Sequence, residues 1–141
     1  MTDCLFCEII AGTRPAHIVL SDEIAVAFLD IRPVFKGHVL VATREHYVTL
    51  PDLPPALVGP LFTRVQAVSA AIGPALGAQG SFVALNNIVS QSVPHVHFHI
   101  VPRNKGDGLF ASGRMIWKRA SYAGDEEREQ VAQRIRAAIP D

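Results

Sequence analysis

The stretch HVHFHIV constrains this chain more than any other feature, because a histidine stands at every second position. Successive side chains of a β-strand point to opposite faces, so the two residue types of this stretch separate. One face carries His95, His97 and His99, and the other carries Val96, Phe98 and Ile100. Three histidines on one strand face are improbable as solvent-exposed residues without a function. We therefore predict a strand over residues 95–101 that packs on a core through its apolar face and presents imidazoles on the other.

Further strands are predicted by short runs of branched apolar residues bounded by turn residues. These runs lie at residues 17–20, 24–29, 38–42 and 81–85. Together with residues 95–101 they give about five strands, most of them close in sequence. Strands interrupted by one long helix are typical of an α+β fold with an antiparallel sheet, and this is the predicted fold class.

The long helix is predicted after Pro51, over residues 57–72, where apolar residues recur at every third or fourth position. We expect Asp52 to cap it, and Gly73 with Pro74 to end it. Pro60 lies inside this pattern, so we expect the helix to start or to kink there. A short helix or turn is expected over residues 4–10 and a C-terminal helix over residues 125–139.

Length and charge limit the classes of function. The chain has 141 residues, a size typical of one domain, and its formal net charge is zero. This charge argues against a nucleic acid polymer or a membrane surface as the partner, but not against a small anionic ligand. The start MTDCLF lacks the pattern of a signal peptide, and we expect no apolar stretch long enough to span a membrane. We therefore expect a cytoplasmic protein.

Two chemistries can use the histidine face. Histidines two positions apart on a strand can ligate zinc, with a further ligand from elsewhere. Alternatively, a neutral imidazole can attack phosphorus while its neighbours hold phosphate oxygens and carry the proton. The segment LNNIVSQS before the histidines offers amides and hydroxyls but no carboxylate. Neutral donors suit phosphate oxygens, and a hydrolytic zinc site usually has a carboxylate nearby, so we favour attack on phosphorus.

Cys4 and Cys7 form a C-x-x-C pair near the N-terminus. Two cysteines cannot make a disulfide scaffold, so the pair indicates half of a metal site or a redox pair. A redox pair usually lies between a strand and a helix of a βαβ unit, which this sequence does not predict. We therefore favour a metal.

Taken together, these residues resemble the histidine triad (HIT) superfamily of nucleotide hydrolases and transferases. HVHFHIV fits the family's His-φ-His-φ-His-φ-φ signature, where φ is an apolar residue. DCLFCEIIAGTRPAHIV is similar to the family's N-terminal segment, and AVAFLDIRPVFKGHVLV is similar to its nucleoside-binding strands. The resemblance implies an antiparallel α+β domain over residues 1–110, followed by a tail over residues 111–141 whose helix packs on the same domain. It also implies a homodimer that joins two sheets.

The resemblance implies a purine nucleotide substrate cleaved at the α-phosphorus, with no catalytic cofactor. His97 would be the nucleophile, His99 would contact the phosphate, His38 would support both, and Ser92 would contact the leaving group. The binding residues would be Phe28 and Ile31 for the base, Asp30 for the ribose, and Asn86 or Asn87 with Ser90 and Gln91 for the phosphate. Arg103 and Lys105 could add positive charge near outer phosphates, and Trp117 and Tyr122 would pack on the sheet or on a partner.

A branch of the family with C-x-x-C near the N-terminus holds a structural zinc ion. The ligands implied here are Cys4, Cys7, His46 and His95. A site with four protein ligands is closed, so this zinc would tie the N-terminus to the sheet without taking part in catalysis.

The sequence departs from the family pattern before the catalytic strand. The loop between the asparagines and Gln91 is two or three residues shorter, and Ser90 stands where a glycine usually precedes the glutamine. Two alternatives to the hydrolase follow. One is a nucleotide-binding interaction protein with little turnover, and the other is a metal-dependent hydrolase that uses the three histidines as ligands. The leaving group, for example of a phosphoramidate or a dinucleoside polyphosphate, is not readable from the sequence.

Overall fold

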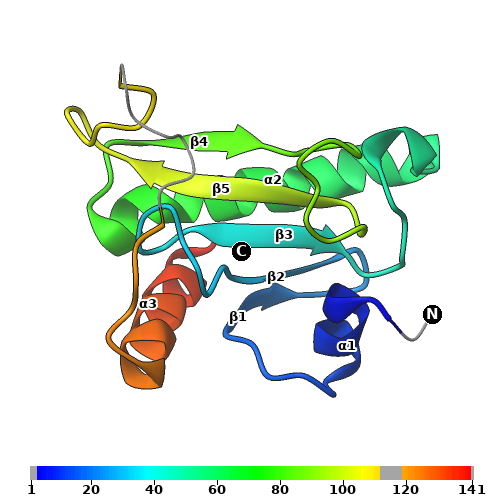
Figure 1. The fold of residues 1–141 in the computed structure, drawn as a ribbon, viewed down its shortest axis with the longest axis horizontal. Coiled ribbons are helices and arrows are strands. Elements are labelled where there is room, and N and C mark those ends of the chain that lie inside the picture. Colours follow the sequence, from blue (N-terminus) through cyan, green and yellow to red (C-terminus); the bar gives the residue numbers. More distant parts are fainter. Residues whose placement is uncertain (1–2, 112–118, 141) are drawn as a thin grey trace.

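The computed structural model describes residues 3–111 and 119–140, which form one five-stranded antiparallel sheet with helices on both faces (Figure 1). The strands are β1 (Ile18–Ser21), β2 (Ala25–Leu29), β3 (Val39–Thr43), β4 (Gly80–Ala84) and β5 (His97–Arg103), in the spatial order β1-β2-β3-β5-β4. The helices are α1 (Leu5–Ala11), α2 (Pro55–Leu76) and α3 (Asp125–Ala138), with a 3₁₀ turn η1 (Leu50–Asp52). The predicted α+β class and the antiparallel sheet are confirmed.

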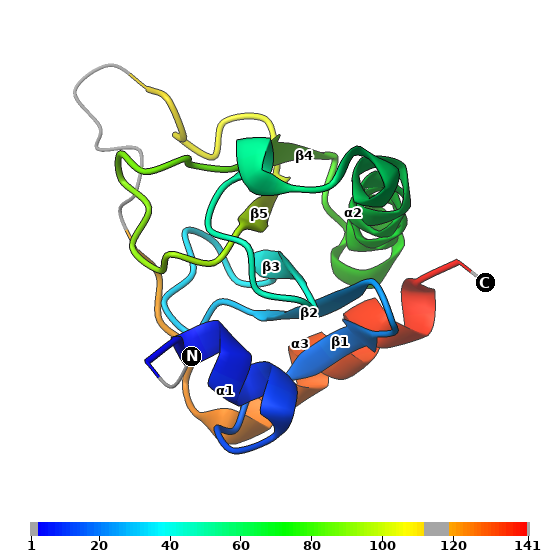
Figure 2. The same cartoon turned by 90° about the vertical axis from the view of Figure 1, so that its right-hand side faces the viewer.

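The two faces of the sheet carry different layers. Figure 2 shows α2 and α3 on one side, and α1 with the segment between β4 and β5 on the other. Alternate residues of the central strands explain this division. Ala27, Val41 and Phe98 belong to the larger core under α2 and α3, whereas Phe28 and Leu40 belong to a smaller core under α1. The imidazoles of β5 lie on the α1 face, so the candidate site lies on that side of the sheet.

The histidine strand begins two residues later than predicted. The β3–β5 ladder pairs Ala42 with His97, and the N–H of Val96 donates instead to the carbonyl of Tyr47 at 2.8 Å. His95 therefore precedes β5, although its ring still packs against Phe6 of α1 on the imidazole face. His95, His97 and His99 are only 0%, 5% and 8% exposed. This burial excludes the interpretation of three solvated surface histidines.

Helix α2 differs from its prediction at both ends. It starts at Pro55, five residues before Pro60, and it passes Gly73 and Pro74 to end at Leu76. Gly77 stops it with a left-handed conformation, at φ +70°. Asp52 does not cap α2. Its carboxylate accepts from the N–H and hydroxyl of Thr49 and so closes the 3₁₀ turn before the helix.

We expected no apolar stretch long enough to span a membrane, but α2, with 22 residues, is long and apolar enough by length and composition alone. The core helix of a soluble protein passes the same test. Here Leu61, Val65, Val68 and Ile72 contribute to the larger core against the sheet. The apolar composition of this helix therefore has an explanation in packing.

The C-terminal helix α3 packs on α2 and on β1. Val131, Ala132 and Ile135 join the larger core. Tyr122, ahead of the helix, is buried, and its hydroxyl accepts from the N–H of Gly37 at 2.9 Å. Trp117 lies outside the described residues. The described part of the tail therefore shares the core of the sheet, while the boundary at residue 110 stays a prediction.

Gly37 shapes the turn that delivers His38 to the sheet. Its φ of +98° lies in the left-handed region, and a Cβ at this position would collide with Cδ1 of Leu76 at the end of α2. At the place where the turn, α2 and Tyr122 meet, any other residue would be strained in its backbone and would displace the Leu76 side chain.

Replacing Gly37 with alanine should destabilise the fold more than replacing Gly12. Both glycines have positive φ, but a Cβ on Gly12 meets nothing within 4 Å. Gly12→Ala should cost about 1 kcal/mol for the backbone conformation alone. Gly37→Ala should cost roughly 2–3 kcal/mol, because Leu76 must also move. Urea denaturation of both variants measures the difference, and equal losses would contradict the packing argument.

Candidate functional site

A cleft of about 610 Å³ lies on the imidazole face of the sheet. Helix α1 contributes Leu5, Phe6 and Ile9 to one wall. The predicted base and ribose contacts Phe28, Asp30 and Ile31 line it, as do the predicted catalytic residues His97, His99 and Ser92. The structure therefore brings residues from α1, β2, β5 and the segment before β5 around one cleft. Phe28 is itself buried under Phe6 at 5.1 Å between ring centroids, whereas Ile31 is 61% exposed.

The protons of His97 can be placed from its hydrogen bond. Its Nδ1 lies 2.7 Å from the carbonyl oxygen of His95, which can only accept, so Nδ1 carries the hydrogen. Nε2 of the neutral ring then holds a lone pair. Burial lowers the pKa of His97 and favours this neutral form. The ring is held by Phe6, whose centroid lies 4.9 Å away at nearly a right angle. His97 thus has the protonation state that a nucleophile requires.

His38 and His99 form a second chain of hydrogen bonds. The backbone N–H of Val34 donates to Nδ1 of His38 at 3.1 Å, so the hydrogen of His38 lies on Nε2. That Nε2 lies 3.0 Å from Nδ1 of His99 and donates to it. The hydrogen of a neutral His99 consequently lies on its own Nε2. Buried His38 does not line the cleft, but it turns His99 into a donor there.

Burial holds both of these rings neutral. It lowers the pKa of His38 to about 2 and that of His99 to about 4, and the neighbouring His97 and Arg119 act in the same direction. His38 also faces Asp30, whose Oδ2 lies 3.8 Å from its Nε2. Because burial raises the pKa of Asp30, this carboxyl is a weaker counter-charge than an exposed one would be.

Arg119 is a cleft residue that the sequence analysis missed. Its Nη1 lies 3.4 Å from Oδ2 of Asp30 and donates to the carbonyl of Arg32 at 2.6 Å. The other carboxylate oxygen of Asp30 accepts from the N–H of Arg32 at 2.9 Å. The predicted ribose acceptor Asp30 is thus already held by the guanidinium of Arg119 and by a backbone N–H. A lone arginine in a tail that matches no motif gives no signal in the sequence.

Two amide side chains of the predicted phosphate-binding loop bond to the main chain of another segment. The amide oxygen of Asn87 accepts from the N–H of Leu50 at 2.8 Å, and the amide nitrogen of Gln91 donates to the carbonyl of Val48 at 2.6 Å. These amides tie the loop to the start of η1 and to the residues just before it. Among the described residues, the cleft lining takes Ser92 from this region but not Asn86, Asn87, Ser90 or Gln91, so their contact with phosphate stays a prediction.

Ser90 adopts the conformation that the family's glycine would suit. Its φ is +63°, and Ile88 in the same loop has a φ of +70°. A left-handed conformation is uncommon for serine and strained for a β-branched residue. The shortened loop therefore stores local strain, held in place by the two amides.

The four predicted metal ligands form one cluster, in which their ligand atoms lie within 4.8 Å of one another. Nδ1 of His95 lies 3.4 Å from Sγ of Cys4, 3.6 Å from Sγ of Cys7 and 3.2 Å from Nδ1 of His46. Tetrahedral zinc with Zn–S bonds of about 2.3 Å and Zn–N bonds of about 2.0 Å needs S···N separations of about 3.5 Å and N···N separations of about 3.3 Å. The cluster therefore has the dimensions of a closed zinc site.

The protonation of these residues also suits a metal. Nε2 of His95 lies 2.7 Å from the carbonyl of Thr43 and donates to it, which leaves the lone pair on Nδ1 toward the cysteines. Burial and the nearby Cys4 raise the pKa of the Cys7 thiol to about 11, so a thiolate here needs a cation beside it. His46, which alone would be taken for a surface residue, lies 3.3 Å from Sγ of Cys7.

The hydrogen bonds argue against a metal shared by the three histidines of the motif. His95 directs its lone pair to the cysteines, and His97 directs its Nδ1 hydrogen to a carbonyl. A second group of potential ligands, Asp30, His38 and His99, also lies within 4.8 Å. Both ring nitrogens of His38 are already engaged, by Val34 and by His99, so His38 has no lone pair for an ion.

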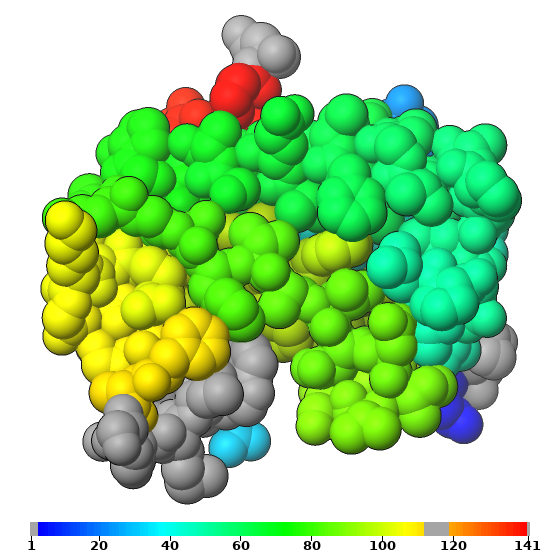
Figure 3. All heavy atoms as spheres, turned by 90° about the horizontal axis from the view of Figure 1, so that it is seen from above, coloured from blue at the N-terminus to red at the C-terminus, as the bar shows by residue number. Residues whose placement is uncertain are grey.

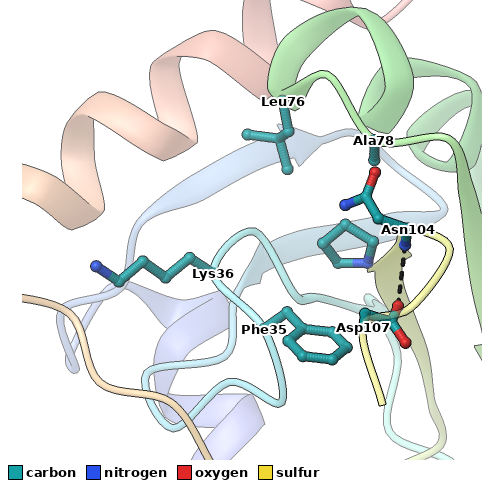
Figure 4. Close-up of a pocket in the computed structure, with 7 residues that line it drawn as sticks. Phe35, Lys36, Leu76, Ala78, Asn104 and Asp107 are labelled. Carbon is teal, nitrogen blue, oxygen red and sulfur yellow. Dashed lines mark hydrogen bonds between the residues drawn. The ribbon is translucent and has the colours of Figure 1, made fainter. Parts of the chain in front are cut away.

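A second, smaller cavity of about 150 Å³ lies beside Pro102 at the end of β5 (Figure 4). The charged residues in its lining are engaged elsewhere. Lys36 pairs with Glu127 at 2.9 Å, and the carboxylate of Asp107 accepts from Arg103 at 2.7 and 2.9 Å. Arg103, which could add positive charge near outer phosphates, is thus paired with Asp107 in the loop that follows β5. The larger cleft remains the candidate site.

Comparison with known proteins agrees with this geometry. A family profile described as HIT domain matches residues 11–106. The chain is 35% identical to adenylylsulfatase HINT3 of Arabidopsis thaliana over 95% of this chain and 68% of that protein. It is 38% identical to adenosine 5'-monophosphoramidase hnt1 of Schizosaccharomyces pombe over 75% of this chain and 79% of that one. The structure of a Zn-bound histidine triad family protein from Mycobacterium smegmatis superposes with a TM-score of 0.82 at 34% identity, covering 96% of this chain and 92% of that one.

Acid should destabilise this fold because it protonates the buried imidazoles of His38 and His99 only after unfolding. An unfolded histidine titrates near pH 6.5, whereas folded His99 titrates near 4 and His38 lower still. Below about pH 6.5 the unfolded chain therefore binds protons that the folded chain does not, and the free energy of unfolding falls as the pH falls toward about 4. Urea denaturation at several pH values measures the slope. His99→Asn should reduce it by up to about 1.4 kcal/mol per pH unit, and an unchanged slope would contradict the burial argument.

Proposed function

The chain belongs to the HIT domain family, and on this premise we propose that it cleaves a purine nucleotide derivative at the α-phosphorus through a nucleotidyl intermediate on His97. The observation that carries the proposal is the hydrogen bond from Nδ1 of His97 to the carbonyl of His95. It leaves the Nε2 lone pair on a residue that lines the cleft. A neutral imidazole of this form can attack phosphorus.

The proposed reaction has two displacements. Nε2 of His97 forms an N–P bond to the α-phosphorus, while the bond from that phosphorus to the leaving group breaks. The leaving group takes a proton from Ser92 or from the Nε2–H of His99, whose donor role follows from its bond with His38. Water then displaces His97 and releases the nucleoside monophosphate. The base would lie against Phe28 and Ile31 and the ribose beside Asp30.

The relatives support an adenylyl group as the part transferred. One is named for release of sulfate from an adenylyl compound and the other for cleavage of an adenosine phosphoramidate. The leaving groups in these names differ while the nucleotide part is shared. This agrees with a mechanism in which His97 and Asp30, which both line the cleft, act on the nucleotide part of the substrate. A phosphoramidate or a dinucleoside polyphosphate would fit the same mechanism.

We also propose that Cys4, Cys7, His46 and His95 hold a structural zinc ion. The ligand separations, the tautomer of His95 and the Zn-bound relative support it. With four protein ligands the ion would have no open position for a substrate, so its contribution would be to structure.

Removing the imidazole of His97 should abolish turnover and spare the fold. His97→Ala should lower kcat for adenosine 5'-phosphoramidate by a factor of about 10⁴ or more, since the nucleophile is lost. Circular dichroism and AMP binding should persist. The matched control is His17→Ala, which removes an imidazole that pairs with Glu129 outside the cleft. Trapping radiolabelled substrate on a residue other than His97 would refute the assignment.

The open edge of the sheet supports a homodimer. Figure 3 looks onto this edge, over β4 and α2. Strand β4 lies at the end of the sheet, and Val83 on it is 40% exposed and Phe62 on α2 is 43% exposed. The opposite edge is covered, because α3 packs on β1 and Arg136 donates to the carbonyl of Ile18. An exposed, apolar edge strand is suited to pairing with a second copy, and we propose that β4 forms the dimer interface.

A charge on β4 should separate the dimer. Val83→Glu would place a carboxylate at the proposed interface, and two like charges facing each other oppose association. Sedimentation velocity should give a dimer for the wild type and a monomer for the variant. Ala11→Glu, on the exposed end of α1 across the sheet, should remain a dimer. A wild type that is monomeric at micromolar concentration would refute the proposal.

A further inference from the structure

The proposed metal ligands and the proposed nucleophile are joined by one residue. His95 offers Nδ1 to the cysteine pair and His46, and its backbone carbonyl accepts the hydrogen of His97 at 2.7 Å. The same carbonyl therefore decides which nitrogen of His97 holds the lone pair. Anything that fixes the main chain at His95 also fixes the tautomer of His97.

His95 lacks the support of the sheet at this point. The ladder between β3 and β5 ends at the pair of Ala42 and His97, so His95 is held by other contacts. Its N–H donates to Val93, and its Nε2 donates to Thr43 at 2.7 Å. Its remaining ring nitrogen faces Cys4, Cys7 and His46. The peptide of its carbonyl is also held by the N–H of Val96, which donates to the carbonyl of Tyr47 at 2.8 Å. The ligand set therefore adds a side-chain restraint on the position of this carbonyl to the restraints from the main chain.

The ligand set also holds one wall of the cleft. Cys4 is the N-cap of α1, and its sulfur accepts the N–H of Cys7 at 3.3 Å. Between the two cysteines lie Leu5 and Phe6, which line the cleft. The ring of Phe6 contacts both His95 and His97, at 5.9 and 4.9 Å between centroids. Helix α1 has only seven residues and is too short to be stable alone.

We propose that the Cys4–Cys7–His46–His95 set is a positioning device for the nucleotide site. Holding a metal, these residues would fix the carbonyl that sets the His97 tautomer and would fix the α1 wall that packs on its ring. His46 and Cys7 are then positioning residues that act through His95. The expected effect on catalysis rests on the proposed function. The tautomer of His97 does not, because it can be measured on the protein without a substrate.

Changing one ligand tests the proposal. His46→Asn should lose bound zinc, whereas His46→Cys should keep it, because three cysteines and one histidine also form a closed zinc site. Nitrogen-15 shifts of the imidazoles report the tautomer. The wild type and His46→Cys should show His97 with its hydrogen on Nδ1. His46→Asn should show a mixture of both tautomers, and kcat should fall by roughly ten- to a hundredfold.

The outcomes separate this inference from the proposed function. A zinc-free, folded His46→Asn protein whose His97 keeps its hydrogen on Nδ1 would overturn the inference even if the enzyme is active. A wild type without turnover would refute the proposed function, while the tautomer comparison would still decide the inference.

If His46→Asn does not fold, cobalt-loaded protein replaces it. Its visible absorption bands depend on the geometry of the ligands, and His97→Ala should shift them, since it removes the ring bonded to the His95 carbonyl. His17→Ala should leave them unchanged. Identical spectra for wild type and His97→Ala would overturn the inference.

Discussion

The structure depends on burying several imidazoles in one place without leaving a ring nitrogen unsatisfied. A buried polar group is costly unless it is hydrogen-bonded, and a buried charge is costlier still. Three of the rings meet this constraint by engaging one nitrogen with the main chain: His95 with Thr43, His97 with His95, and His38 with Val34. The ring of His99 instead accepts from the ring of His38. In each case the second nitrogen is left with a defined role. The same hydrogen bonds that permit burial therefore assign which atom can ligate, attack or donate.

This constraint also explains why two sites of different chemistry can lie next to each other. His95 and His97 are two residues apart, yet one directs its lone pair to sulfur and the other belongs to the cleft. Neither site depends on a side-chain charge of its histidines, because burial keeps the rings neutral. Two clusters of protonated imidazoles at this spacing would repel each other. Neutral rings with fixed tautomers do not.

Much of this arrangement could be predicted from the sequence because it depends on the spacing of residues along the chain. The alternation of HVHFHIV predicts both faces of β5, and the C-x-x-C pair predicts half of a metal site, without any knowledge of the tertiary structure. The place of His46 beside the cysteines needed the family resemblance, since an isolated histidine carries no pattern. The boundaries were predicted less well. Helix α2 passes Gly73 and Pro74, because Leu76 still packs against the core beyond them, and tertiary contacts of this kind are invisible to a local pattern.

The cleft was predicted best where regular structure positions the side chains and worst where loops do. The chemistry of LNNIVSQS indicated phosphate donors, but composition does not say where an amide points. In the folded chain Asn87 and Gln91 bond to the main chain near η1, a segment more than thirty residues away in sequence. Arg119 reaches Asp30 from the tail across 89 positions. The strand thus fixes the imidazoles of the cleft, whereas the loops and the tail, which sequence patterns describe poorly, place the side chains of Asn87, Gln91 and Arg119.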